Sequence, residues 1–206
     1  MNFPHMIKKV ALVVAMAAAV PAFASTNLVS NGSFESNSLA SGTWGIFYGN
    51  SVKDWNLGPA GLEIRNGIAG TAQNGLNFVE LDTTKNSHIF QTITTVAGQM
   101  YNLSFWYAPR AGVSENSNGI AVSWGENQSF TVSGEGSGEW TKISFSVMGS
   151  GKDKLQFNAV GKSDSYGGSL DNVSLTAAVP EPESYAMLLA GLGVMGAVAR
   201  RRSKKN

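Results

Sequence analysis

Short stretches of alternating apolar and polar residues fill the centre of the chain. In the segment 100–107, four large residues share one face: Tyr101, Leu103, Phe105 and Tyr107. Because successive side chains of a strand point to opposite sides, this pattern predicts a sheet with one buried face. The segments 139–147 and 153–160 repeat the alternation. An antiparallel sheet that is covered on one side is typical of such sequences.

Turn signals such as Asn31-Gly32 and Gly167-Gly168 separate these stretches. The predicted strands are 27–35, 62–65, 76–81, 87–95, 100–107, 119–124, 128–132, 139–147, 153–160 and 169–176. No amphipathic helix of three turns interrupts them. This number of short strands predicts an all-β domain over residues 25–178, built as a two-sheet antiparallel sandwich.

The N-terminal segment is organised as a secretion signal. Lys8 and Lys9 precede an apolar run over 10–20, and Ala22-Phe23-Ala24 follows just before Ser25. These are the three parts of a signal peptide, and the run is well short of the roughly 20 residues that span a bilayer. We expect a signal peptidase to remove residues 1–24, by cleavage between Ala24 and Ser25. The alternative is an uncleaved anchor.

The C-terminal segment has an equally clear order. Pro180-Glu181-Pro182 is followed by an uncharged run over 184–199 and then by Arg200-Arg201-Arg202. The prolines keep the chain from continuing a strand, and the run predicts one hydrophobic helix, slightly short for a membrane span. Basic residues stay on the cytoplasmic side of a membrane, so the sandwich domain is expected outside the cytoplasm.

This order over residues 179–206 resembles the PEP-CTERM sorting signal of Gram-negative bacteria. The resemblance implies that an exosortase, a membrane-embedded cysteine protease, cuts near Pro180-Glu181-Pro182 and transfers the protein to the cell surface. It also implies strains that make exopolysaccharide. We therefore expect transient anchoring in the inner membrane, with the domain in the periplasm, and then the surface or the extracellular matrix as the destination. A plain C-terminal anchor helix is the alternative.

The charge of the domain differs from that of the whole chain. Fifteen basic residues less seven in the two targeting segments leave eight for residues 25–178, and fourteen acidic residues less Glu181 and Glu183 leave twelve. The domain thus carries about −4, which excludes an electrostatic footprint for nucleic acid or for an anionic membrane. Because cysteine is absent, no disulfide stabilises the fold.

A second resemblance covers most of the domain. The opening 27–35 (NLVSNGSFE), the closing 170–175 (LDNVSL) and the central segments 90–91 and 98–105 are similar to strands of carbohydrate-binding jelly rolls with the galactose-binding-like fold. This resemblance implies a jelly-roll sandwich.

It also implies a structural Ca²⁺ near one rim, held by Glu35 and Asp171 with loop carbonyls. Calcium takes six to eight oxygen ligands of these kinds. The alternative is that Glu35 caps a turn and Asp171 bonds a neighbouring loop.

Sugar recognition requires flat aromatic faces beside polar groups, because a ring covers the apolar C–H face of a pyranose while polar groups bond its hydroxyls. The predicted ligand-binding residues are Trp44, Tyr48, Trp55, Asn102, Trp106 and Tyr166. The alternative is that these aromatics belong to the core or cover a sheet.

An enzyme would need other features. Glu63, Glu80 and Asp82 are the carboxylates in or beside strands, and the i, i+2 spacing of Glu80 and Asp82 puts them on one face. His88 is the single histidine of the domain, which excludes a site of several histidine ligands. We predict no catalytic residues. The predicted function is binding of exopolysaccharide or adhesion, with a purely structural biofilm protein and an exopolysaccharide hydrolase as alternatives.

Overall fold

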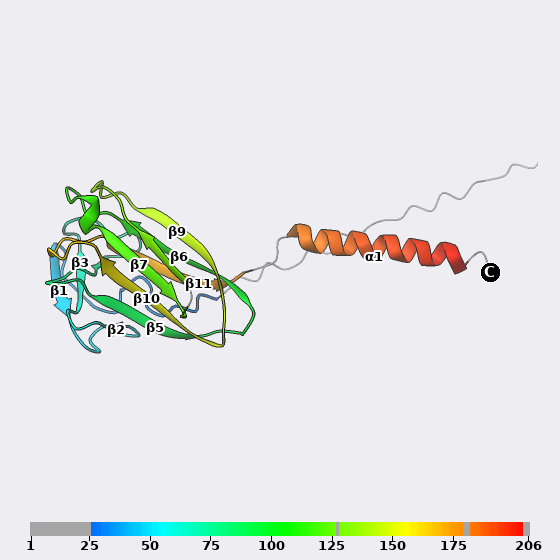
Figure 1. The fold of residues 1–206 in the computed structure, drawn as a ribbon, viewed down its shortest axis with the longest axis horizontal. Coiled ribbons are helices and arrows are strands. Elements are labelled where there is room, and N and C mark those ends of the chain that lie inside the picture. The colour runs from blue at the N-terminus through cyan, green and yellow to red at the C-terminus, as the bar shows by residue number, and fades with distance from the viewer. Residues whose placement is uncertain (1–25, 127, 179–181, 204–206) are drawn as a thin grey trace, which may run out of the picture.

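Two antiparallel sheets pack face to face in a computed structural model that describes residues 26–126, 128–178 and 182–203. The architecture is a β-sandwich followed by one helix near the C-terminus (Figure 1). The predicted all-β jelly-roll fold is confirmed. The proposed signal peptide and its cleavage site lie outside the described residues.

One sheet has six strands in the order β1-β3-β4-β11-β6-β9. These are β1 (Thr43–Phe47), β3 (Leu62–Asn66), β4 (Asn77–Glu80), β11 (Ser169–Ala177), β6 (Met100–Ala108) and β9 (Thr141–Met148). The last strand, β11, lies between β4 and β6, so the C-terminal strand of the domain pairs with strands from the middle of its sequence. This non-local pairing brings residues from distant parts of the sequence onto one sheet face.

The other sheet has five strands in the order β2-β5-β10-β7-β8. They are β2 (Asn56–Leu57), β5 (His88–Thr94), β10 (Lys152–Val160), β7 (Gly119–Trp124) and β8 (Gln128–Val132), with a short 3₁₀ helix η1 (Glu115–Ser117) before β7. The predicted ranges 119–124 and 128–132 are those of β7 and β8.

The core lies between the two sheets and follows the predicted alternation. All four residues of the apolar face of β6 are buried: Tyr101, Leu103, Phe105 and Tyr107. Phe105 meets Phe157 of β10 edge to face, with ring centroids 5.2 Å apart, so the two sheets interlock through aromatic contacts. Burial of these side chains supplies the main stabilisation of a domain without disulfides.

The predicted strand 27–35 is wrong. Asn31 and Phe34 have positive φ angles of 49° and 58°, and the amide of Phe34 closes a turn onto the Asn31 carbonyl. Left-handed residues interrupt an extended strand, and asparagine tolerates this conformation better than most. The segment still lies along β11, because the Leu28 amide donates to the Leu175 carbonyl at 2.8 Å.

Helix α1 (Pro182–Ser203) follows the sandwich. Pro182 opens the helix and Arg200 and Arg201 are exposed, whereas Pro180, Glu181 and the Arg202 side chain lie outside the described part of the structure. No helix in the described ranges combines the length and the apolar character that crossing a membrane requires.

Candidate functional site

A pocket of about 330 Å³ lies over β1 and β3, on the face of the six-stranded sheet that points away from the core. Strand β3 buries Leu62 and Ile64 in the core, so Glu63 and Arg65 face the pocket. The register pairs Trp44 of β1 with Arg65. The lining residues are Trp44, Ile46, Glu63, Arg65, Ile68, Ala69, Thr83, Thr84, Arg110, Ser165 and Tyr166.

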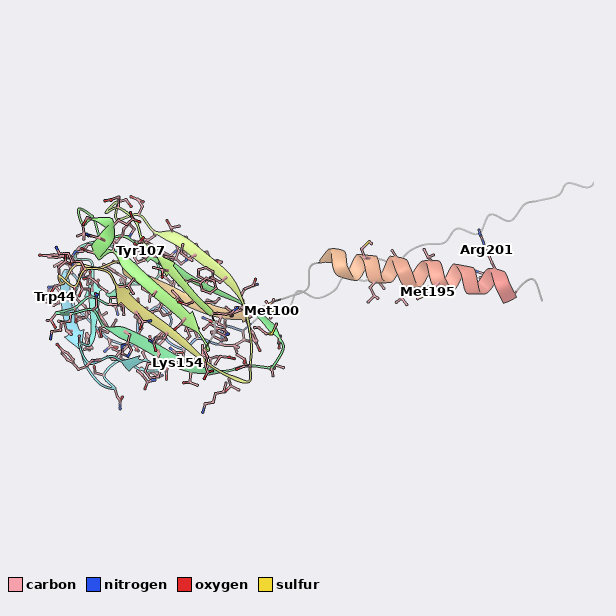
Figure 2. The ribbon with its side chains drawn as sticks, in the orientation of Figure 1. Trp44, Met100, Tyr107, Lys154, Met195 and Arg201 are labelled. Atoms are coloured by element: carbon pink, nitrogen blue, oxygen red, sulfur yellow. The ribbon has the colours of Figure 1, made fainter. Side chains whose placement is uncertain are left out.

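Two aromatic side chains of this pocket are open to solvent. Trp44 is 53 % exposed and Tyr166 is 49 % exposed, and Trp44 projects from one end of the domain in Figure 2. The Arg110 guanidinium carbon lies 4.6 Å from the Tyr166 ring centroid. This cation–π contact holds the Tyr166 ring in place. The pocket therefore offers two exposed aromatic rings, one of which is held by Arg110.

A buried ion network forms the floor. Arg65 is 2 % exposed, and its Nε and Nη2 donate to Glu63 Oε1 and Glu80 Oε2, both at 2.5 Å. Arg110 Nη1 lies 3.2 Å from the same Glu80 oxygen. Glu63 and Glu80 come together because they are directly opposite in the β3–β4 register. Such charge-assisted bonds fix the side chains in one geometry.

Burial dominates the titration of Glu80. The side chain is completely buried, and loss of water raises the pKa of Glu80 to about 7, against the opposing influence of Arg65 and Arg110. The Glu80 carboxyl therefore gains or loses its proton near neutral pH.

The carboxylates of 80 and 82 hold the loop that carries Tyr166. Asp82 Oδ2 accepts from the amides of Asp164 and Ser165 at 2.9 and 3.0 Å, and Glu80 Oε1 accepts from Gly167 at 2.9 Å. The predicted common face of Glu80 and Asp82 is confirmed, since a Cβ built on Gly167 would touch both side chains. Both carboxylates are buried and act as anchors of the pocket wall.

One donor of the floor is left over. Within the described residues, Nη1 of the buried Arg65 has no hydrogen-bond partner. An unsatisfied buried donor costs roughly 1–3 kcal/mol. The atom is itself buried, so it faces the interior of the floor and not the open side of the pocket.

The predicted ligand-binding residues divide into three groups. Trp44 and Tyr166 share the pocket, and Tyr48 lies next to it on the same face of the β1 segment, exposed and packed over Gly61. The prediction for Trp55 is wrong. Trp55 is 2 % exposed, stacks on Phe34 and donates from Nε1 to the Asn31 carbonyl, so it is a core residue.

Asn102 and Trp106 lie on β6, across the same outer sheet face. Asn102 is exposed and Trp106 is half-buried between its register partners Lys142 and Asp171. Four strand spacings separate β1 from β6, which is about 19 Å. The structure therefore does not bring Trp106 into the pocket of Trp44.

Glu35 and Asp171 both accept hydrogen bonds from one loop, which is the arrangement given above as the alternative to a calcium site. Glu35 Oε1 accepts from the amides of Leu76 and Asn77 at 2.9 and 2.8 Å, and Asp171 Oδ2 accepts from Gln73 and Asn74 at 2.8 Å each. Burial raises the pKa of Asp171 to about 7, and the Glu35 charge adds to this shift.

No basic side chain in the described ranges pairs with Glu35 or Asp171, and no cluster of three or more His, Asp or Glu side chains there could hold a metal. The two carboxylates are oxygen donors of the kind that a hard cation takes, and main-chain amides already donate to them. Calcium at this position stays a prediction.

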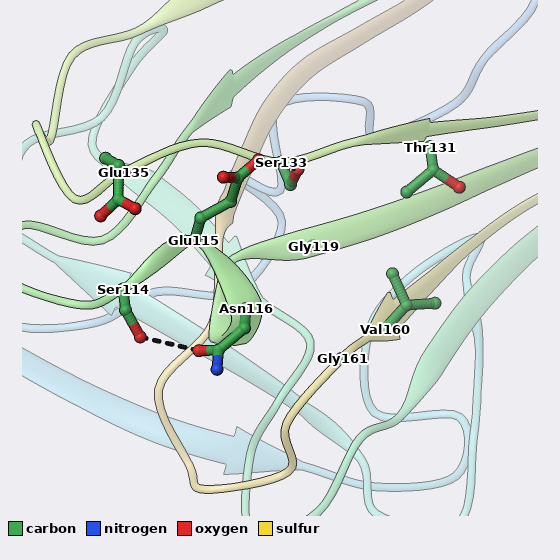
Figure 3. A pocket seen from close by; sticks show the side chains of 9 residues that line it. All are labelled: Ser114, Glu115, Asn116, Gly119, Thr131, Ser133, Glu135, Val160 and Gly161. Carbon is green, nitrogen blue, oxygen red and sulfur yellow. Dashed lines mark hydrogen bonds between the residues drawn. The ribbon is translucent and has the colours of Figure 1, made fainter.

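A larger pocket of about 550 Å³ lies beside η1 (Figure 3). Its polar lining includes Glu115, which accepts from the Ser133 hydroxyl at 2.8 Å, and Asn116, which accepts from Ser114 at 2.7 Å. None of its lining residues is aromatic. It therefore lacks the flat apolar surface that sugar stacking requires.

Arg65 and Arg110 are the site residues that sequence reasoning missed. The Glu63-x-Arg65 spacing was the available signal, because i, i+2 residues of a strand share a face. That spacing indicates a buried ion network only once Glu80 is known to lie opposite Glu63. This pairing is given by the β3–β4 register, which the structure shows.

Parts of the domain are similar to much larger bacterial proteins. A multifunctional-autoprocessing repeats-in-toxin protein of Vibrio cholerae serotype O1 is 32 % identical over 135 residues, which is 60 % of this chain and 3 % of that protein. The Vibrio vulnificus counterpart is 35 % identical over 101 residues, 48 % of this chain and 2 % of that protein. This chain thus spans only a small part of the relatives that it matches.

Solved structures share the fold at low sequence identity. The TmCBM61 module, solved with β-1,4-galactotriose, has a TM-score of 0.50 and 20 % identity over 75 % of this chain and all of that module. A Stig cyclase, Fisc, from Fischerella sp. TAU has a TM-score of 0.56 and 13 % identity over 75 % of this chain and 98 % of the cyclase. One fold thus serves both a carbohydrate-binding module and a cyclase.

The tail has a match of its own. Residues 178–203 fit the family model of the PEP-CTERM protein-sorting motif. That motif indicates an exported protein that is sorted to the cell surface. The chain therefore carries a PEP-CTERM sorting motif behind a jelly-roll domain of the kind found in carbohydrate-binding modules.

Proposed function

We propose that the sandwich domain binds a surface glycan in the pocket of Trp44 and Tyr166. The observation that carries this proposal is the combination of two half-exposed aromatic rings with a buried, hydrogen-bonded floor. The rings cover the C–H face of a sugar, and the partly exposed Arg110 guanidinium donates to its hydroxyl oxygens.

The floor supports binding because it is rigid before the ligand arrives. Arg65 is held at Nε and Nη2 by two carboxylates, and Arg110 is held by Glu80 and Tyr166. A preorganised site loses little conformational entropy on binding. Aromatic rings and fixed donors together give both affinity and orientation.

Binding is favoured over hydrolysis. A glycosidase needs one carboxylic acid and one carboxylate that reach the substrate. Glu80 and Asp82 are completely buried, and their oxygens already accept from Arg65, Arg110 and the 164–167 amides. The carboxylates beside this pocket are therefore engaged in holding it together.

The partner we propose is the exopolysaccharide of the producing strain. The sorting motif accompanies export to the cell surface, and the resemblance implies strains that make this polymer. In this route, α1 holds the protein at the outer side of the inner membrane until the tail is cut.

The direct experiment measures binding of residues 25–206 to exopolysaccharide purified from the producing strain. Trp44→Ala and Tyr166→Ala should each weaken binding by roughly tenfold or more. A flat ligand ring stacked on one aromatic side chain contributes about 1–3 kcal/mol to the binding free energy. Trp106→Ala, which removes a partly exposed tryptophan outside the pocket, should bind as the unchanged protein does.

Circular dichroism of each variant checks that the fold is retained. If Trp106→Ala lost binding while Trp44→Ala bound normally, the glycan site would lie on the outer face of β6 and not in the proposed pocket. No binding by the unchanged protein would contradict the proposed function itself.

A further inference from the structure

Large exposed apolar side chains of the sandwich are few, and three of them gather at one end. They are Val96, Met100 and Met148, which we call the tail-end patch. Figure 2 shows Met100 at the end where the chain leaves toward α1 and Trp44 at the opposite end. Isolated apolar residues on a surface are ordinary, whereas contiguous ones point to an interaction.

The three residues are neighbours. Met100 and Met148 are opposite each other in the β6–β9 register. Gly149, next to Met148, donates to the Gln99 carbonyl at 2.8 Å and lies so close to Val96 that a Cβ built on it would be 2.6 Å from the Val96 oxygen. The patch is therefore one surface formed by the β5–β6 turn and the β9–β10 turn.

The tail departs from this same surface. The amide of Ala178, the last residue before the tail, donates to the Met100 carbonyl at 2.9 Å. Three residues, 179–181, separate Ala178 from Pro182, where α1 begins. Four fully extended peptide steps reach at most about 14 Å. Whatever surface receives the start of α1 therefore lies within about 14 Å of the patch.

Helix α1 needs an apolar surrounding. Six of its large apolar side chains are more than half exposed: Met187, Leu188, Leu189, Leu192, Val194 and Met195. Contact with lipid would cover these side chains, whether or not the helix crosses the bilayer.

We infer that the tail-end patch rests on the lipid bilayer, at the outer surface of the inner membrane, while α1 is still attached. This inference depends on the membrane stage of the proposed route. Two exposed lysines, Lys152 and Lys154, lie beside the patch, but Glu126 and the buried Asp153 balance them. The contact is therefore mainly apolar, with weak dependence on salt.

This orientation has a functional consequence. A domain that rests on its tail end points the pocket of Trp44 and Tyr166 away from the membrane, because that pocket is at the opposite end. A glycan outside the membrane could then be bound before the tail is cut.

Methionine oxidation tests the contact on residues 25–206. The protein is mixed with vesicles of phosphatidylethanolamine and phosphatidylglycerol, pulsed with hydrogen peroxide, and digested for mass spectrometry of each methionine. Met100 and Met148 are exposed and oxidise readily in solution. Vesicles should slow their oxidation several-fold, together with that of Met187 and Met195 in the tail.

Two outcomes separate the inference from the route on which it depends. Protection of Met187 and Met195 with unchanged oxidation of Met100 and Met148 would overturn the inference and leave the membrane stage intact. Unchanged oxidation of all four residues would overturn both.

A matched pair of variants gives a second readout. Val96→Asp and Leu76→Asp add the same charge at side chains that are 62 % and 64 % exposed, but only Val96 lies in the patch. Val96→Asp should lower the fraction that co-sediments with vesicles, and Leu76→Asp should not. Equal co-sedimentation of the two variants would contradict the inference.

Discussion

Arg65 and Glu80 form an ion pair on the outer face of a sheet, where a strand normally turns its charges to water. The loops 67–71 and 164–167 cover this pair, so Glu80 has no exposed surface. A buried charge persists when opposite charges are fixed beside it, as Glu63 and Glu80 are beside Arg65. The pocket is thus built on charged residues that the solvent does not reach.

Glu80→Gln should change how stability depends on pH. The pKa of Glu80 rises from 4.5 in the unfolded chain to about 7 in the folded one. Between these values the folded state binds the extra proton, so stability falls as pH rises through this window. The contribution is on the order of 3 kcal/mol. Glutamine keeps an acceptor for Arg65 and removes the proton.

Urea unfolding from pH 4.5 to 8, in both proteins, checks this prediction. The free energy of unfolding of the unchanged chain should decline more steeply over the window than that of Glu80→Gln. The difference between the two curves isolates Glu80 from the other titrating groups, including Asp171. Parallel curves would mean that Glu80 stays ionised throughout.

The exposure of the tryptophan side chains could be predicted only in part from the sequence. Trp44 and Trp55 are both in the Gly- and Ser-rich segment 36–61, and their local sequences do not distinguish them. Trp44 lies on an edge strand that pairs with β3, whereas Trp55 enters the core beside Phe34. Whether each tryptophan is buried depends on how its segment packs in the folded domain, and the composition of the segment does not predict this.

Strands were predictable where the alternation was strong. The ranges of β7 and β8 agree with prediction to the residue, and β6 and β10 agree to within one residue at an end. Strand β1 was missed because Gly45 and the surrounding loop residues weaken its pattern. Without β1, the alignment of Trp44 over Arg65 could not be foreseen, and so neither could the pocket.

The loop 73–77 is bonded by one residue from near the start of the domain and by another from near its end. Glu35 near the start and Asp171 near the end bind its backbone amides. If Ca²⁺ binds there as predicted, it stabilises the folded state only, and the melting temperature must depend on calcium.

Thermal unfolding in calcium, in chelator and in magnesium tests this. Calcium should raise the melting temperature by several degrees over chelator, and Asp171→Asn should abolish that increase. Superimposed melting curves in calcium and chelator would show that the two carboxylates act as loop anchors alone.

At the scale of the whole molecule, the sandwich has two different ends. One end carries the pocket of Trp44 and Tyr166, and the other carries the tail-end patch and the exit to α1. The sorting motif at 178–203 was recognisable from sequence, because the order of its three parts is distinctive. The separation of the two ends follows from the fold and not from any local motif.

The most direct test of glycan binding is a nuclear magnetic resonance titration of residues 25–206 with size-fractionated fragments of the exopolysaccharide. The five tryptophans give five indole N–H signals that can be assigned by substitution. The account predicts that the Trp44 signal shifts while those of the buried Trp55 and Trp124 stay in place. A shift confined to Trp106, or none at concentrations where the polymer is retained, would contradict it.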